Sequence, residues 1–316
     1  MRKALIVILA SLIVSITTAA QTASTRVIKQ EDELRRRWWM SMSLATVFDT
    51  NITHDEQQVS AFGLVPSFGF HFRDNPERPS IEADYEVALH RYNNTDEFDR
   101  VSQNLTVEYR KQLVKRLYAK TTTEISLKGS SEDREINNNY ILEQQLQYRF
   151  TTNTRLAGLA AYRLKRYPLV DQDSNSIDSY AGAKIEQRFH GDRRVELSYR
   201  YDHNRARDPR NNYIRRTYTL EFQTPLSIRR RDLLLAEFRY SPRDYQNRTT
   251  RVNGLRVPRH DDRWVFEVSY ERFIRPNLSM AIDYQFEHRD SNDIDKIFTS
   301  NAFGLSFTFD KWNLKW

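Results

Sequence analysis

Apolar and polar residues alternate with a period of two along most of the chain between Trp38 and Phe309. In residues 38–48, the even positions carry Trp, Met, Met, Leu, Thr and Phe, whereas Ser41, Ser43 and Ala45 lie between them. Because successive side chains of a β-strand point to opposite faces, such a segment has one apolar and one polar face. The pattern recurs about fourteen times with turn residues in between, as is typical of transmembrane β-barrels.

The segments with this pattern predict fourteen strands. They lie at residues 38–48, 60–72, 80–91, 101–111, 116–128, 139–150, 154–165, 177–189, 194–203, 213–224, 232–241, 263–273, 277–288 and 299–309. The connections are alternately short, at 73–79, 112–115, 151–153, 190–193, 225–231 and 274–276, and long, at 49–59, 92–100, 129–138, 166–176, 204–212, 242–262 and 289–298. Outer-membrane barrels have short periplasmic turns and longer outer loops. We therefore predict an all-β, transmembrane, antiparallel up-and-down barrel of about 14 strands in a bacterial outer membrane, with both termini periplasmic.

The N-terminus has the features of a secretory signal. Arg2 and Lys3 precede an apolar run at 4–16, and the small residues Thr18, Ala19 and Ala20 follow it. We predict a signal peptide at 1–20, a periplasmic lead-in at 21–37 and the barrel at 38–316. A retained anchor helix is the alternative for the first segment.

The composition agrees with this assignment. The mean hydropathy of −0.75 is low, but a barrel strand needs only every second residue to be apolar. The chain has no cysteine, which excludes disulfides and a lipidated cysteine. The net charge is +7, yet arginines are interleaved with acidic residues instead of forming one basic stripe. Nucleic acid is therefore not an expected partner.

Charged residues occupy the face of the strands opposite to the apolar one. A charge that faces lipid at mid-bilayer costs about 2–4 kcal/mol, so these side chains must face a hydrated or ion-paired lumen. The alternative role for them is to brace neighbouring strands as ion pairs. The residues predicted to line the pore are Glu82, Asp84, Glu86, His90, Arg110, Lys120, Glu124, Lys184, Glu186, Arg188, Glu196, Arg200, Arg215, Glu221, Glu237, Arg239, Arg263, Glu267, Asp283 and Glu287.

The segment 302–309 resembles the terminal signal strand of outer-membrane barrels, with a glycine followed by spaced aromatic residues. The resemblance implies recognition by the barrel-assembly machinery through edge pairing of the last strand. The predicted signal residues are Gly304, Phe307, Phe309 and Trp316. An ordinary last strand is the alternative.

The longest connection, 242–262, is rich in arginine. Asn253-Gly254 at its middle predicts a type I′ hairpin whose strands extend beyond the membrane. We hypothesise that its arginines bind an anionic polysaccharide or lipopolysaccharide, and a solvated loop is the alternative. These arginines are Arg243, Arg248, Arg251, Arg256 and Arg259.

No catalytic motif is present. The seven histidines are scattered, and the chain lacks HExxH, G-x-S-x-G and glycine-rich phosphate-loop motifs. We predict neither an enzyme nor a cofactor or metal site. A lipid-modifying enzyme is the third function considered, after the two below.

Three segments resemble the β-barrel porin type 2 family: Phe48-Asp49-Thr50-Asn51-Ile52, the run from Tyr85 to Tyr92, and Asp96-Glu97-Phe98-Asp99. The resemblance implies an outer-membrane barrel of a group often associated with exopolysaccharide production. The predicted function is a passive channel for polar solutes, with exopolysaccharide export as its narrower form. A structural or adhesion barrel that binds surface glycans is the alternative. The expected partners are outer-membrane lipid, lipopolysaccharide, the assembly machinery and polysaccharide, and the oligomeric state stays open.

Overall fold

The computed structural model describes residues 38–53, 58–74, 80–93, 98–129, 137–167, 172–190, 193–226 and 232–313. The predicted signal peptide, the predicted lead-in and Trp316 lie outside these ranges. Within them, no helix is long and apolar enough to cross a membrane. The strands are β1 (Trp38–Asp49), β2 (Ala61–Arg73), β3 (Ser80–Tyr92), β4 (Arg100–Val114), β5 (Leu117–Gly129), β6 (Asn138–Arg149), β7 (Thr154–Arg166), β8 (Ser176–Arg188), β9 (Arg194–Ala206), β10 (Tyr213–Pro225), β11 (Asp232–Tyr240), β12 (Arg243–Val252), β13 (Leu255–Arg275), β14 (Leu278–Ser291) and β15 (Phe298–Asn313). Short 3-10 helices lie at η4 (Gln172–Ser174), η5 (Pro209–Asn211) and η6 (Ile294–Lys296).

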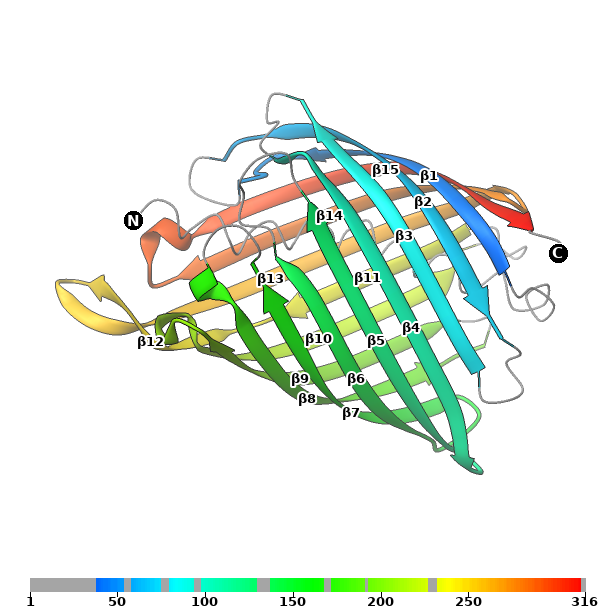
Figure 1. The fold of residues 1–316 in the computed structure, drawn as a ribbon, viewed down its shortest axis with the longest axis horizontal. Helices are drawn as coiled ribbons and strands as arrows, with labels where there is room; N and C mark the ends of the chain where they lie inside the picture. Colours follow the sequence, from blue (N-terminus) through cyan, green and yellow to red (C-terminus); the bar gives the residue numbers. More distant parts are fainter. Residues whose placement is uncertain are drawn as a thin grey trace.

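The strands form one closed sheet. Each strand pairs antiparallel with its neighbours, and β15 pairs with both β14 and β1, so that the sheet closes on itself (Figure 1). β11 and β12 follow one another between the same two neighbours, β10 and β13, and form one strand of the wall. The wall therefore has fourteen strands. This closed antiparallel barrel confirms the predicted fold class.

The two ends of the barrel differ. β1 begins where β15 ends, with Trp39 paired to Asn313, and Figure 1 shows both strand ends on the same side. This end, which we call the short-turn rim, also has turns of only two residues at 115–116 and 276–277. The opposite end contains the connections predicted to be long, and we call it the long-loop rim.

Residues 242–262, a predicted connection with a hairpin at its middle, are almost entirely β-strand. Here β12 and the first part of β13 pair as a hairpin. Asn253 and Gly254 at its tip have φ values of 49° and 81°, as a type I′ turn requires. β12 pairs with β10 only over Tyr213–Arg215, so most of the hairpin projects beyond the wall (Figure 1). The predicted hairpin is confirmed.

The outer face of the barrel is apolar. Met42 and Leu44 on β1 are 50% and 47% exposed, whereas Ala45 and Val47 on its inner face are buried. Trp264 and Phe266 on β13 are likewise exposed. In a monomer surrounded by water these side chains would be a large unfavourable apolar surface, but in a bilayer they contact lipid.

Aromatic side chains gather on the outer face near both rims. Tyr199, Tyr218, Tyr240 and Trp264 form a row over β9, β10, β11 and β13, with ring centroids 5.2, 6.2 and 4.1 Å apart in that order. The row reaches the long-loop rim at Tyr240, the last residue of β11. Near the short-turn rim, the ring of Trp38 lies 4.3 Å from that of Phe72. Aromatic residues occupy the membrane–water interfaces of such barrels, so Tyr240 with Trp264 and Trp38 with Phe72 mark the limits of the membrane-spanning wall.

The segment 48–52, which is one of the three segments with the family resemblance, forms hydrogen bonds where β1 meets β15. We call this junction, which closes the barrel, the seam. The carboxylate of Asp49 accepts hydrogen bonds from Ser300 Oγ at 2.7 Å and from the backbone N–H of Asn51 at 2.8 Å. The backbone N–H of Thr50 donates to the carbonyl of Asn301 at 2.9 Å, and Thr50 Oγ1 accepts from the Asn301 N–H. These bonds connect the end of β1 to β15, the strand most distant from it in sequence.

Candidate functional site

A charged cavity occupies the half of the lumen next to the short-turn rim. It has a volume of about 420 Å³ and is lined by sixteen residues from strands β2 to β10. Seven of them are lysine or arginine, five are glutamate, three are glutamine and one, Ala157, is apolar. The alternation of the strands explains this composition, because every second side chain points away from lipid and into the lumen.

Ion pairs hold many of the cavity side chains along the wall. Lys120 Nζ lies 2.7 Å from Glu108 Oε2, and Arg73 lies 2.9 Å from Glu82. Lys184 lies 3.4 Å from Glu196. Each of these pairs joins two adjacent strands, so it braces the wall while leaving charged groups on the cavity surface. The bracing role and the pore-lining role are therefore compatible.

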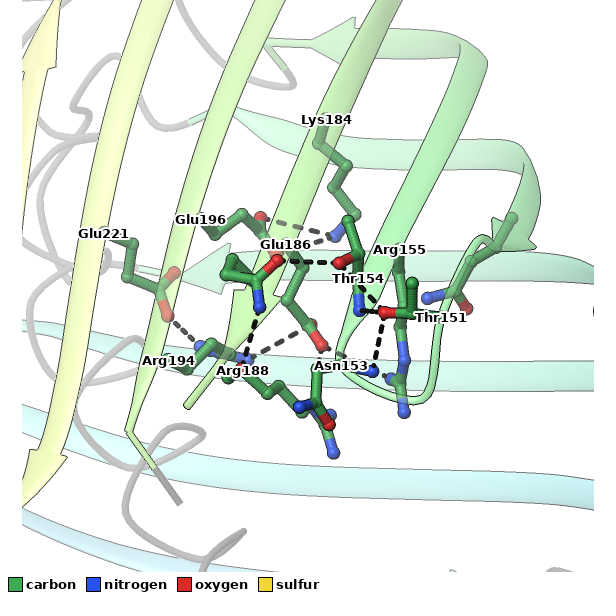
Figure 2. Close-up of polar contacts among 12 residues, drawn as sticks. Thr151, Asn153, Thr154, Arg155, Lys184, Glu186, Arg188, Arg194, Glu196 and Glu221 are labelled. Carbon is green, nitrogen blue, oxygen red and sulfur yellow. Dashed lines mark hydrogen bonds and ion pairs between the residues drawn. The ribbon is translucent and has the colours of Figure 1, made fainter. Parts of the chain in front are cut away.

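Glu186 on β8 is the most connected acid of the cavity. Its carboxylate lies 2.7 Å from Arg188, 3.5 Å from Arg155 and 4.0 Å from Arg194 (Figure 2). Arg194 also contacts Glu221 on β10. One carboxylate thus joins β7, β8 and β9, and the cations around it outnumber the acids.

A second group of charges lies nearer the long-loop rim, on β7 to β10. Asp178, which is fully buried, accepts a contact of 2.8 Å from Lys165 and lies 3.6 Å from Arg163. Asp202, also fully buried, lies 3.1 Å from Arg200 and 3.3 Å from Arg215. Four cations therefore surround two carboxylates, and this part of the wall is basic.

Aromatic rings lie between these cations. The guanidinium of Arg200 lies 4.8 Å from the ring of Tyr180, and that of Arg243 lies 4.6 Å from the ring of Tyr213. Lys165 Nζ on β7 donates to Tyr213 Oη on β10 at 3.1 Å. This bond joins two strands that are separated by β8 and β9, so the Lys165 side chain extends along the inner side of these two strands.

One strand opposite to β10, β3, carries acids on its inward face. β3 lies seven strands from β10 in the fourteen-stranded wall, which is halfway around the barrel. The acids are Glu82, which is paired with Arg73 on β2, Asp84, which accepts a hydrogen bond from His71 at 2.7 Å, and Glu86. Acids and cations therefore both occur on this side of the lumen.

The structure places the predicted pore-lining residues on the lumen side of the strands. Eight of them line the cavity: Glu82, Arg110, Lys120, Lys184, Glu186, Arg188, Glu196 and Glu221. The other twelve occupy inward positions elsewhere along the wall: Asp84, Glu86, His90, Glu124, Arg200, Arg215, Glu237, Arg239, Arg263, Glu267, Asp283 and Glu287. Arg263 and Glu287, for example, form a two-bond pair at 2.6 and 2.8 Å.

Sequence reasoning missed several lumen residues that share the same strand parity. Glu108, Arg155 and Arg194 line the cavity, and Asp178 and Lys165 form the group near the long-loop rim. Each lies an even number of residues from an inward residue on its own strand, so strict counting along β4, β7, β8 and β9 would have found them.

The hairpin arginines do not form one outer surface, as the hypothesis for 242–262 assumed. Arg259 is 2% exposed and binds Asp261 through two bonds of 2.8 and 2.7 Å. Arg243 is also buried, and it donates to Tyr245 Oη at 3.2 Å. Both occupy inward positions at the base of the hairpin. Only Arg248, Arg251 and Arg256 remain on its projecting part.

The predicted assembly signal lies on β15. Gly304 faces inward, while Phe307 faces lipid and is 43% exposed. The strand continues four residues past Phe309 to Asn313. Whether the assembly machinery recognises this strand stays a prediction. No group of three or more His, Asp or Glu side chains placed to hold a metal ion occurs within the described ranges.

No protein-family model and no curated protein matches the chain. Among solved structures, in-vitro folded OmpT, an outer membrane protein of Vibrio cholerae, matches with a TM-score of 0.52 at 9% identity, over 87% of this chain and 97% of that one. The loop L8 deletion mutant of OmpT matches with a TM-score of 0.51 at 9% identity, over 87% and 99%. OprD from Pseudomonas aeruginosa matches with a TM-score of 0.47 at 8% identity, over 88% and 96%.

At these identities the likeness to OmpT shows the fold alone. Together with the closed fourteen-stranded wall, the lipid-facing apolar belt and the ionic lumen, it defines the chain as a transmembrane barrel of the bacterial outer-membrane class. The resemblance to the β-barrel porin type 2 family stays a prediction.

Proposed function

We propose that this barrel is a passive channel for polar and charged solutes. The observation that carries the proposal is the cavity of about 420 Å³, in which Ala157 is the one apolar lining residue among sixteen. Charged and amide side chains retain water in the lumen. Charged side chains on the wall of a lumen also steer ions and polar solutes.

The proposed orientation places the short-turn rim in the periplasm and the long-loop rim at the cell surface. The alternating connection lengths support it, because barrels of this class have their short turns on the periplasmic side. Export of a polysaccharide is the narrower form of the proposal. It rests on the sequence resemblance alone.

Liposome swelling with the purified full-length chain tests the proposal. We expect folded barrels to admit small neutral sugars, and the rate to fall as the sugar size increases. Ala157→Trp should slow uptake because it fills the cavity, whereas Leu156→Trp, its lipid-facing neighbour, is the matched control and should not. Liposomes that contain correctly folded wild-type barrels and do not swell would contradict the proposal. Release of entrapped acidic oligosaccharide, compared with small sugars, would test the polysaccharide form separately.

A further inference from the structure

Exposed arginines lie on the outer face of β7, β9 and β10, toward the long-loop rim. Arg216 precedes Tyr218 by two residues on the same face of β10, toward the long-loop rim, and is paired across the strands with Tyr201. Arg205 follows Tyr201 by four residues on β9, and Arg166 is the last residue of β7. A strand rises about 3.4 Å per residue, so Arg216 lies roughly 7 Å beyond Tyr218 along β10, and Arg205 lies roughly 14 Å beyond Tyr201 along β9. We call Arg166, Arg205 and Arg216 the arginine collar.

The collar is not neutralised by nearby acids. Among the described residues, no carboxylate lies within ion-pair distance of Arg166 or Arg205. Arg216 has one partner, Asp244 at 3.4 Å, and both side chains are nearly half exposed, so water weakens this pair. The acids Asp173 and Asp208 on the adjoining loops already face Arg207 and Arg210.

The collar is confined to one flank of the barrel. On β13 and β14, the outward positions beyond the aromatic row carry Asp262 and Asp290. An anion at this depth would therefore meet favourable charge over β7 to β10 and unfavourable charge over β13 and β14.

Exposed apolar side chains lie beside and below the arginines. Ile177 on β8 is 52% exposed and is paired with Arg205, and Tyr162 on β7 is 67% exposed, four residues before Arg166. A molecule that fits this surface has acyl chains to cover Ile177 and Tyr162 and phosphates to reach the guanidinium groups. Arginine binds phosphate with paired, charge-assisted hydrogen bonds.

We propose that the arginine collar binds the phosphates of lipid A, the lipid part of lipopolysaccharide, in the leaflet at the long-loop rim. This assignment rests on the orientation proposed above, in which that rim faces the cell surface. It does not depend on conduction, because the collar lies on the outer face of the wall. Loss of lipid binding and loss of channel activity are therefore separable.

The test measures binding of diphosphorylated lipid A to the purified full-length chain in detergent by native mass spectrometry. We expect Arg166→Gln/Arg205→Gln/Arg216→Gln to weaken binding by about tenfold or more, and the single Arg205→Gln to have a smaller effect in the same direction. The matched control, Arg248→Gln/Arg251→Gln/Arg256→Gln, removes three arginines from the projecting hairpin and should bind as the wild type does. Heat-modifiable migration on gels would verify that each variant is folded.

Two lipid comparisons use the wild-type chain and need no variant. Dephosphorylated lipid A should bind about as weakly as lipid A binds to the collar variant, and phosphatidylglycerol should bind more weakly than lipid A. Equal binding of the dephosphorylated lipid would overturn the role of phosphate, and equal binding of phosphatidylglycerol would overturn the assignment to lipid A. Unchanged lipid A binding by the folded collar variant, or its loss in the hairpin variant, would overturn the proposed site.

Discussion

The ammonium group of Lys165 on β7 lies 3.1 Å from the phenol oxygen of Tyr213 on β10, although β8 and β9 separate these strands along the wall. Lys165 also lies 2.8 Å from the buried carboxylate of Asp178. The two contacts hold a long cationic side chain along the inner side of β8 and β9. In the proposed channel, this side chain would reduce the open cross-section between the cavity and the long-loop rim.

Replacing Lys165 should therefore change conduction. We expect Lys165→Met to raise single-channel conductance, because it removes the contact with Tyr213 that holds the side chain in the lumen. We also expect it to shift selectivity toward cations, because Asp178 then has one cation fewer beside it. The variant should also lose about 1–3 kcal/mol of stability, since a buried acceptor loses a partner. Leu164→Met, on the lipid-facing side of the same strand, is the control. Conductance and reversal potential equal to those of the wild type would contradict the role given to Lys165 in the lumen.

Glu186 should set the charge balance of the cavity. Glu186→Gln leaves Arg155, Arg188 and Arg194 with one negative charge fewer among them. We expect the reversal potential in a salt gradient to shift toward anion preference, and more strongly at low ionic strength because salt screens the arginines. Asp173→Asn, an exposed acid outside the lumen, is the control for a loss of one charge. A shift of equal size in both variants would argue against a local effect of the cavity.

The hydrogen bonds of Asp49 should stabilise the barrel seam. Asp49→Ala removes the acceptor of Ser300 Oγ and of the Asn51 N–H, both in a buried setting. We expect a loss of about 1–3 kcal/mol in the free energy of unfolding, measured by urea titration in lipid vesicles. Asp173→Ala, which removes only a 3.9 Å surface pair, should change it by less than about 0.5 kcal/mol. Equal effects would show that the seam bonds contribute no more than a surface acid.

The stability of the hairpin base should depend on pH through His260. This residue precedes Trp264 by four residues on β13, toward the long-loop rim, and lies outside the membrane-spanning wall. Partial burial alone would lower the pKa of His260, but hydrogen bonds with Asp244 and Asp262 outweigh it and raise the pKa above its ordinary value of 6.5. The stabilising contribution of this side chain is therefore fully present below pH 6.5 and is lost as the pH rises through the raised pKa.

Hydrogen exchange at the hairpin base measures this effect. Protection of the paired residues Asp244 and His260 should fall as the pH passes the raised pKa, after correction for the intrinsic exchange rate. His260→Gln should remove this pH dependence. Because His260 is partly exposed, the contribution should stay below about 1 kcal/mol. Protection that increases with pH in the wild type would contradict the sign of the pKa change.

The barrel was predictable from the sequence because its wall has a simple period. Within each strand of the wall, every second residue faces lipid, so strand number and face could be derived without knowledge of contacts. The cavity was partly predictable for the same reason, since Lys120 and Glu186 follow strand parity. Strand parity alone could not show that Lys165 reaches Tyr213, because that contact depends on the curvature of the wall. It also could not show how far β12 and β13 continue beyond the membrane-spanning wall, which is what places Arg243 and Arg259 on strands and not on a loop.

Planar-bilayer recording with the purified chain, from which the predicted signal peptide has been removed, shows whether the barrel conducts. We expect stepwise insertion of ion-conducting units in dilute salt, with smaller steps for Ala157→Trp and unchanged steps for Leu156→Trp. Correctly folded barrels that insert stably and remain electrically silent at all voltages would contradict the proposed channel.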